Sequence, residues 1–150
     1  MIKRKLILFV GIVVILIQSC NFPKTELREI KFKPEMQEVA DKYKKQLEPE
    51  IFQTSPGWFR FDTITTHKVV VAIFNSDKLP KEFDEKKRLA LDIASDVYPQ
   101  IENKNDFSKV EIVFQNQSGS VVKMKTKSNY PFSYEEIEEY IENNKSMKKE

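Results

Sequence analysis

The clearest pattern in the chain is an amphipathic helix that follows a proline at residue 34. Apolar side chains recur there at spacings of three and four residues, which places them on one face of a helix. They are Met36, Val39, Ala40, Tyr43 and Leu47. Pro34 suits the first turn of a helix, and Pro49 disfavours helical geometry at the residue before it. The pattern therefore predicts a first helix that ends near residue 48.

Two further helices are predicted later in the chain. The first follows Pro80 and stops at Pro99, and its apolar stripe consists of Phe83, Ala90, Ile93, Ala94 and Val97. The last begins in the segment SYEEIEEYIENN, where Ser133 and Glu136 have the spacing of a capping box. Acidic residues in its first turns and lysines after its end also suit the helix dipole.

Two segments between these helices are typical of β-hairpins. Residues 58–75 are aromatic and β-branched, which predicts two strands that turn near residues 65–68. Strands are also predicted at 109–115 and 121–127, joined by a loop at 116–120 that contains Gly119. Alternation places one set inward, namely Val110, Ile112, Phe114, Val122 and Met124, and another outward, namely Glu111, Lys123 and Lys125. The order α-β-β-α-β-β-α predicts an α+β fold with two layers, in which helices cover one face of a four-stranded antiparallel sheet.

The first hairpin is apolar on both faces. The core face is assigned Phe59, Phe61, Val71 and Ile73, because they match the inward set of the second hairpin. The opposite face then carries Trp58, Ile64, Val70, Ala72 and Phe74. Either the first helix packs on that face, or the face is a partner surface made chiefly by Trp58, Val70, Ala72 and Phe74.

The chain begins with features of a secretory signal peptide. Residues 6–17 form an apolar run that is shorter than the roughly 20 residues needed to span a membrane. The run follows the basic cluster at 3–5, and the small residue Ser19 stands at the expected cleavage position. The same features are also compatible with an uncleaved membrane anchor and with a cleaved, freely secreted protein.

The segment Ile17-Gln18-Ser19-Cys20 resembles the lipobox of bacterial lipoproteins. The resemblance implies that residues 1–19 are removed as a signal peptide and that the Cys20 thiol receives a diacylglyceryl group, usually with acylation of the freed amine. It also implies a location in the cell envelope. Asn21 is not the aspartate that retains enterobacterial lipoproteins in the inner membrane, so the outer membrane is expected in a Gram-negative host.

Between the lipid and the domain lies a polar segment. Residues 20–33 are interpreted as the lipidated cysteine and a tether, and residues 34–150 as a single domain. The 13 residues after Cys20 reach at most about 43 Å at roughly 3.3 Å each. Ile30 and Phe32 alternate with charged residues, so the end of this segment is expected to pair as an edge strand.

Charge and cysteine content exclude some functions. Residues 1–19 contain three of the 25 basic residues and none of the 23 acidic ones, so the remaining chain would carry a net charge of −1. Such a balance gives no reason to expect nucleic acid as a partner. Cys20 is the only cysteine, so its lipidation would leave no thiol for a disulfide.

No arrangement of residues in the sequence is typical of a catalytic, cofactor or metal site. His67 is the only histidine and is expected in a turn, and residues 118–120 lack the spacing of a nucleophile elbow. Several glutamates are interpreted as the exposed surface of the last helix, namely Glu135, Glu136, Glu138, Glu139 and Glu142. We therefore expect a lipid-anchored envelope protein with a non-catalytic binding, assembly or inhibitor domain, and the alternative is an envelope hydrolase that uses carboxylates.

Overall fold

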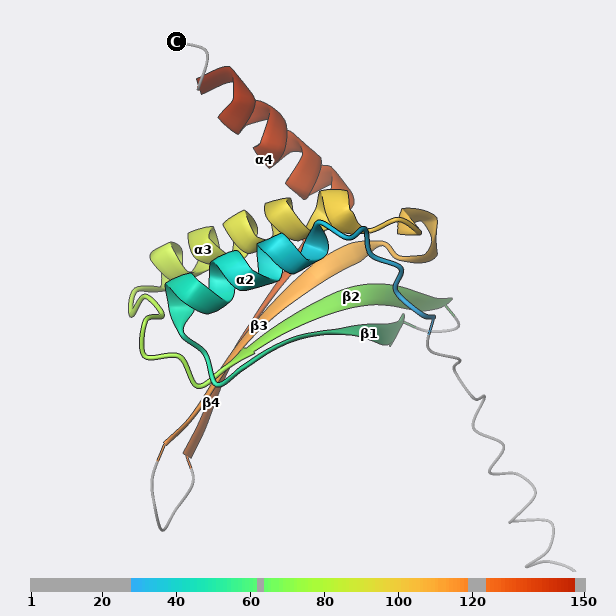
Figure 1. The fold of residues 1–150 in the computed structure, drawn as a ribbon. Coiled ribbons are helices and arrows are strands. Elements are labelled where there is room, and N and C mark those ends of the chain that lie inside the picture. Colours follow the sequence, from blue (N-terminus) through green and yellow to red (C-terminus); the bar gives the residue numbers. More distant parts are fainter. Residues whose placement is uncertain (1–27, 62–63, 119–123, 148–150) are drawn as a thin grey trace, which may run out of the picture.

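A computed structural model describes residues 28–61, 64–118 and 124–147 of the chain (Figure 1). Its main elements are α2 (Met36–Leu47), β1 (Ile51–Phe61), β2 (Ile64–Phe74), α3 (Phe83–Val97), β3 (Lys109–Ser118), β4 (Met124–Ser133) and α4 (Tyr134–Met147). Two short 3-10 helices, Tyr98–Gln100 and Lys104–Asp106, connect α3 to β3. The predicted order α-β-β-α-β-β-α and the α+β class are confirmed.

The four strands form one sheet in the order β1-β2-β3-β4. The two hairpins are antiparallel, but β2 and β3 pair in parallel, so the prediction of a purely antiparallel sheet is wrong at its centre. The reason is the connection, because α3 carries the chain back to the end of the sheet where β2 began. Both central strands are rich in apolar residues, which is typical of parallel strands in the middle of a sheet.

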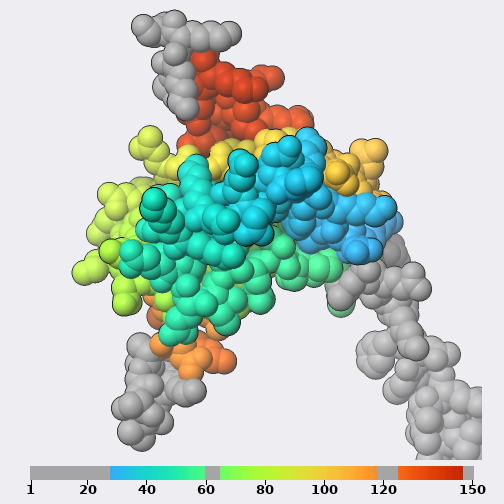
Figure 2. Space-filling model, viewed as in Figure 1, coloured from blue at the N-terminus to red at the C-terminus, as the bar shows by residue number. Residues whose placement is uncertain are grey.

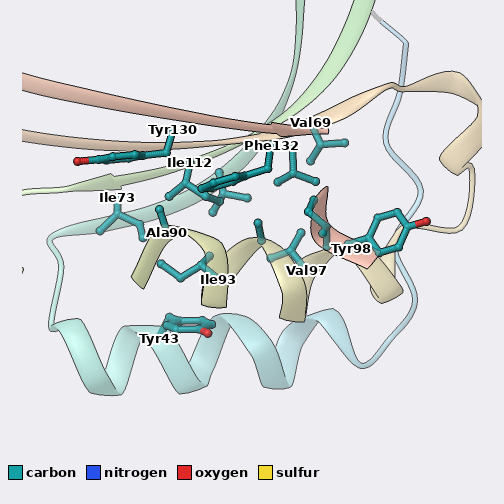
Figure 3. Close-up of a cluster of buried hydrophobic side chains, with 14 of the residues drawn as sticks. Tyr43, Val69, Ile73, Ala90, Ile93, Val97, Tyr98, Ile112, Tyr130 and Phe132 are labelled. Carbon is teal, nitrogen blue, oxygen red and sulfur yellow. The ribbon is translucent and has the colours of Figure 1, made fainter. Parts of the chain in front are cut away.

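The core lies between the sheet and the helices α2 and α3 (Figure 3). Helix α3 buries Ala90, Ile93, Ala94 and Val97 as predicted, whereas Phe83 at its first turn is 67% exposed, contrary to the prediction. Helix α2 buries Met36, Tyr43 and Leu47 in the same core. The sheet contributes alternate residues of its two central strands, namely Val69, Val71, Ile73, Val110, Ile112 and Phe114.

The first hairpin differs from the prediction in its length and in its register. Strand β1 begins at Ile51 rather than at residue 58, and the strands are separated by residues 62–63 rather than by a turn at 65–68. Phe59 consequently pairs with Thr66, and Trp58 pairs with His67. Because side chains alternate between faces, this register moves Trp58 to the face of Val69 and moves Phe59 to the opposite face.

The second hairpin keeps the predicted alternation in β3 but shifts β4. Val110, Ile112 and Phe114 face the core, and β4 runs over Met124–Ser133 rather than over 121–127. Tyr130 and Phe132 therefore belong to the core, which the sequence did not indicate. Val122 and Lys123 lie outside the described residues, and Lys125 is exposed as predicted.

The last helix begins with the predicted capping box. The backbone N–H of Ser133 donates to Glu136 Oε2 at 2.7 Å, and the N–H of Glu136 donates to Ser133 Oγ at 3.2 Å. Helix α4 packs on α3 and β4 and projects away from the sheet (Figure 1). Its glutamates Glu135, Glu136, Glu138, Glu139 and Glu142 are exposed.

Candidate functional site

The second face of the sheet has no helix packed on it in the described part of the chain (Figure 1). Its centre is apolar, because alternate residues of β2 and β3 point there. Ala72 and Val113 are each only 6% exposed and pair directly across the two strands. Val70 and Phe74 flank Ala72 and are partly exposed, and Ile51 pairs with Phe74 at the end of β1. We call this set, Ile51, Val70, Ala72, Phe74 and Val113, the helix-free patch.

One end of the helix-free patch is closed by charged side chains. Lys68 Nζ donates to Glu111 Oε2, and Asn129 Nδ2 donates to Glu111 Oε1 at 3.4 Å. Beside them, Lys109 Nζ lies 4.1 Å from the ring centroid of Phe59. Glu111 is only 8% exposed, so its carboxylate is compensated by these donors. The ion pair separates the apolar centre of the face from the end that carries the β1–β2 hairpin.

Three of the four residues predicted for a partner surface lie together. Val70, Ala72 and Phe74 share the helix-free patch, whereas Trp58 points to the other face of the sheet. The alternative that the first helix covers these residues is wrong, because the buried stripe of α2 packs against α3 and the opposite face of the sheet. The side chain of Ile64 lies outside the described residues. Binding of a partner to this surface remains a prediction.

A groove of about 540 Å³ lies among the three main helices. Figure 2 shows α2 across the front of the molecule and α4 rising behind it. The lining comes from α2, α3 and α4 together with Pro99, and it mixes apolar side chains with carboxylates, amides and lysines. This groove was not predicted from the sequence, although two aspartates four residues apart in α3 were a signal for it.

Hydrogen bonds tie the three helices together along the groove. Tyr43 Oη of α2 donates to Asp96 Oδ2 at 2.9 Å, and Lys42 Nζ lies 2.6 Å from the same oxygen. Tyr140 Oη of α4 donates to Asp92 Oδ1 at 2.5 Å. Burial, followed by the hydrogen bond to Asp96, raises the pKa of Tyr43 far above its ordinary value, so this hydroxyl remains a donor. Each carboxylate is therefore engaged by a neighbouring helix.

His67 does not lie in a turn, as the sequence suggested, but in β2 opposite Trp58. Its Nδ1 is buried and has no hydrogen-bond partner within the described residues. No group of three or more His, Cys, Asp or Glu side chains in the described ranges could hold a metal ion.

Comparisons of the chain with protein-family models, with curated proteins and with solved structures found no match. Among the described residues, none of the helices is long and apolar enough to cross a membrane. Residues 1–27, which include the predicted signal peptide and Cys20, lie outside the described part of the chain.

Proposed function

We propose that this protein is a lipid-anchored protein of the bacterial cell envelope whose domain binds another envelope protein without catalysing a reaction. The observation that carries the proposal is the helix-free patch. An apolar sheet face in a two-layer domain is ordinarily covered by a second layer. Here Ile51 is exposed and Val70 and Phe74 are partly exposed around the buried Ala72 and Val113, and exposed apolar side chains grouped in this way are typical of a protein interaction surface. The anchor is proposed from the lipobox-like segment that ends at Cys20.

The chemistry of the helix groove supports binding over catalysis. A catalytic carboxylate has to be free to exchange a proton or to attack a substrate. Asp96 is held by both Lys42 and Tyr43, and Asp92 is held by Tyr140. These contacts account for both carboxylates as links between helices.

The partner surface is tested by truncating Phe74 in the full-length protein. We expect Phe74→Ala to reduce capture of an envelope partner in a pull-down from native membranes while the melting temperature changes little. Phe83→Ala is the matched control, because Phe83 is an exposed aromatic residue outside the helix-free patch. If Phe74→Ala and Val70→Asp both capture the partner as strongly as the wild-type protein does, the proposal is contradicted.

The anchor is tested separately at Cys20. We expect the wild-type protein to incorporate labelled palmitate and the Cys20→Ala variant to accumulate as an unlabelled precursor. If Cys20→Ala is still processed to the mature size, the protein is not a lipoprotein. By the sorting pattern of the family, fractionation of a Gram-negative host is expected to recover the protein in the outer membrane.

A second candidate function is an envelope hydrolase, and the groove is the observation that favours it. Asp92 and Asp96 are four residues apart on α3, so their Cβ atoms lie about 6 Å apart. A pair of neighbouring carboxylates is the catalytic set of most glycoside hydrolases. Release of soluble fragments from purified envelope by the wild-type protein, lost in both Asp92→Asn and Asp96→Asn, would establish the hydrolase and overturn the non-catalytic proposal.

A further inference from the structure

The residues from Arg28 onward contact the domain, so the tether expected over residues 20–33 is shorter than predicted. Arg28 Nη1 lies 3.1 Å from Asp106 Oδ1, and the N–H of Lys31 donates to Asn103 Oδ1 at 2.8 Å. Phe32 forms an isolated antiparallel bridge with Ile101. Residues 28–33 therefore pair with the connection after α3, rather than extending an edge of the sheet as predicted.

A lipid on Cys20 would then lie close to one end of the domain. Eight residue steps separate Cys20 from Arg28, and even a fully extended chain of that length spans only about 26–29 Å. Any surface beside Arg28 would be confined near the lipid headgroups. A weak contact between that surface and the bilayer would be populated because of the high effective concentration.

The surface beside Arg28 is the end of the β1–β2 hairpin (Figure 1). Arg28 forms an ion pair with Asp106. Two residues after Asp106, the backbone N–H of Ser108 donates to the carbonyl oxygen of His67 at 3.0 Å. His67 lies directly opposite Trp58 in the hairpin. This series of contacts places Trp58 at the end of the domain where the chain leaves toward Cys20.

The chemistry of this end suits a membrane interface. Trp58 is 46% exposed, and Phe59 beside it carries the Lys109 ammonium over its ring. Residues 28–33 and 102–109 carry five basic side chains, Lys109 among them, and three acidic ones. Tryptophan concentrates at the level of lipid headgroups, and lysine and arginine are attracted to anionic lipids.

We propose that the hairpin end of the domain lies against the bilayer, with the indole ring of Trp58 in the lipid headgroup region. The inference rests on the proposed lipid anchor at Cys20. Ile51 lies at the opposite end of β1, seven residues before Trp58, which corresponds to about 23 Å along the strand. In this orientation the Phe74 end of the helix-free patch points away from the membrane and is open to a partner.

Trp58 is the only tryptophan in the chain, so its fluorescence reports its own environment. The lipidated mature protein is reconstituted in phosphatidylethanolamine–phosphatidylglycerol vesicles, with and without bromine atoms on the acyl chains. We expect a blue-shifted emission maximum and loss of most of the intensity in the brominated vesicles. The matched control is the double variant Trp58→Phe/Ile51→Trp, which moves the single tryptophan to a site of similar exposure, since Ile51 is 49% exposed. Its emission is expected to stay unquenched.

The outcomes separate the orientation from the anchor. Palmitate labelling of the wild-type protein tests the anchor, whatever the fluorescence shows. A labelled protein whose Trp58 emission is not quenched would overturn the proposed orientation and leave the anchor intact. Equal quenching at both positions would also overturn it, because the domain would then have no preferred end at the membrane.

Discussion

Truncation of two valines in the same strand measures whether one face of the sheet is covered and the other is not. Val110 and Val113 both belong to β3 and differ little in exposure, at 0% and 6%. Val110 lies under the helices, whereas Val113 belongs to the helix-free patch. The same change, valine to alanine, therefore removes the same atoms in two different surroundings.

The expected costs differ because only one site can retain a cavity. Removing two methylene-sized groups costs about 1.6 kcal/mol of transfer free energy at about 0.8 each. At Val110 the packed helix layer leaves a residual void, which adds up to about 1 kcal/mol at roughly 24 cal/mol per Å³. At Val113 no helix layer of the described chain holds a void open, so we expect only the transfer cost, about 1.6 kcal/mol or less. The lower strand propensity of alanine affects both variants and largely cancels in the comparison.

Urea denaturation followed by Trp58 fluorescence measures both free energies of unfolding. A cooperative transition with unchanged slope is expected for each variant, so that the midpoints report stability directly. Val110→Ala should lose up to about 1 kcal/mol more than Val113→Ala, because only Val110 adds the cavity cost. Equal losses would refute the reasoning, because they would mean that a packed layer also covers Val113.

Three further changes test local features of the fold. Ser133→Ala removes half of the capping box and should cost about 0.5–2 kcal/mol in urea denaturation, whereas no change would mean that the box does not stabilise α4. Glu48 ends α2 with φ of 46°, so Glu48→Gly should relieve a left-handed strain and stabilise the protein by up to about 1 kcal/mol; a loss of stability would contradict this. Burial, followed by the hydrogen bond to Glu138, raises the pKa of Tyr98 to about 12. The protonated Tyr98 hydroxyl contributes fully to folding stability below the unfolded-state pKa of about 10, and this contribution is lost as the pH rises through 12. The melting temperature of Tyr98→Phe should therefore fall less than that of the wild-type protein between pH 10 and pH 12.

The helices were predictable because their signals are local and redundant. The stripe of α2 combines 3.6-residue periodicity with Pro34 and Pro49, and α3 ends just before Pro99. The capping box needs only residues three positions apart, and both of its hydrogen bonds are present. Features that depend on a few neighbouring residues can be read from one sequence.

The direction of the central strands could not be read in that way. The sequence locates strands in both hairpins, but whether β3 runs parallel to β2 depends on where α3 delivers the chain. The start of β1 was also hidden, because Pro56 and Gly57 are typical turn residues. Both are accommodated in an edge strand, and a Cβ on Gly57 would lie only 2.9 Å from Val70 Cγ2.

The helix groove was missed because its chemistry comes from three separate elements. Asp92 and Asp96 are ordinary surface residues in the pattern of α3 alone. Their engagement depends on Tyr43 from α2 and Tyr140 from α4, which are about 50 residues away in either direction. Such long-range contacts follow from helix packing and leave no periodic signal in the sequence.

The register of the first hairpin determines how both proposed surfaces are composed. A turn centred on residue 66 would pair Trp58 with Phe74, and the four apolar residues would then share one face as a single patch. The observed partner of Trp58 is His67, seven residues away from that position, and because seven is an odd number Trp58 lies on the other face at the hairpin end. Because the chain toward Cys20 leaves beside that end, the isolated tryptophan is suited to the lipid surface, whereas Val70, Ala72 and Phe74 remain suited to a protein. A register shift by an odd number of residues thus divides the one predicted surface between the two faces of the sheet, and we propose a different partner for each.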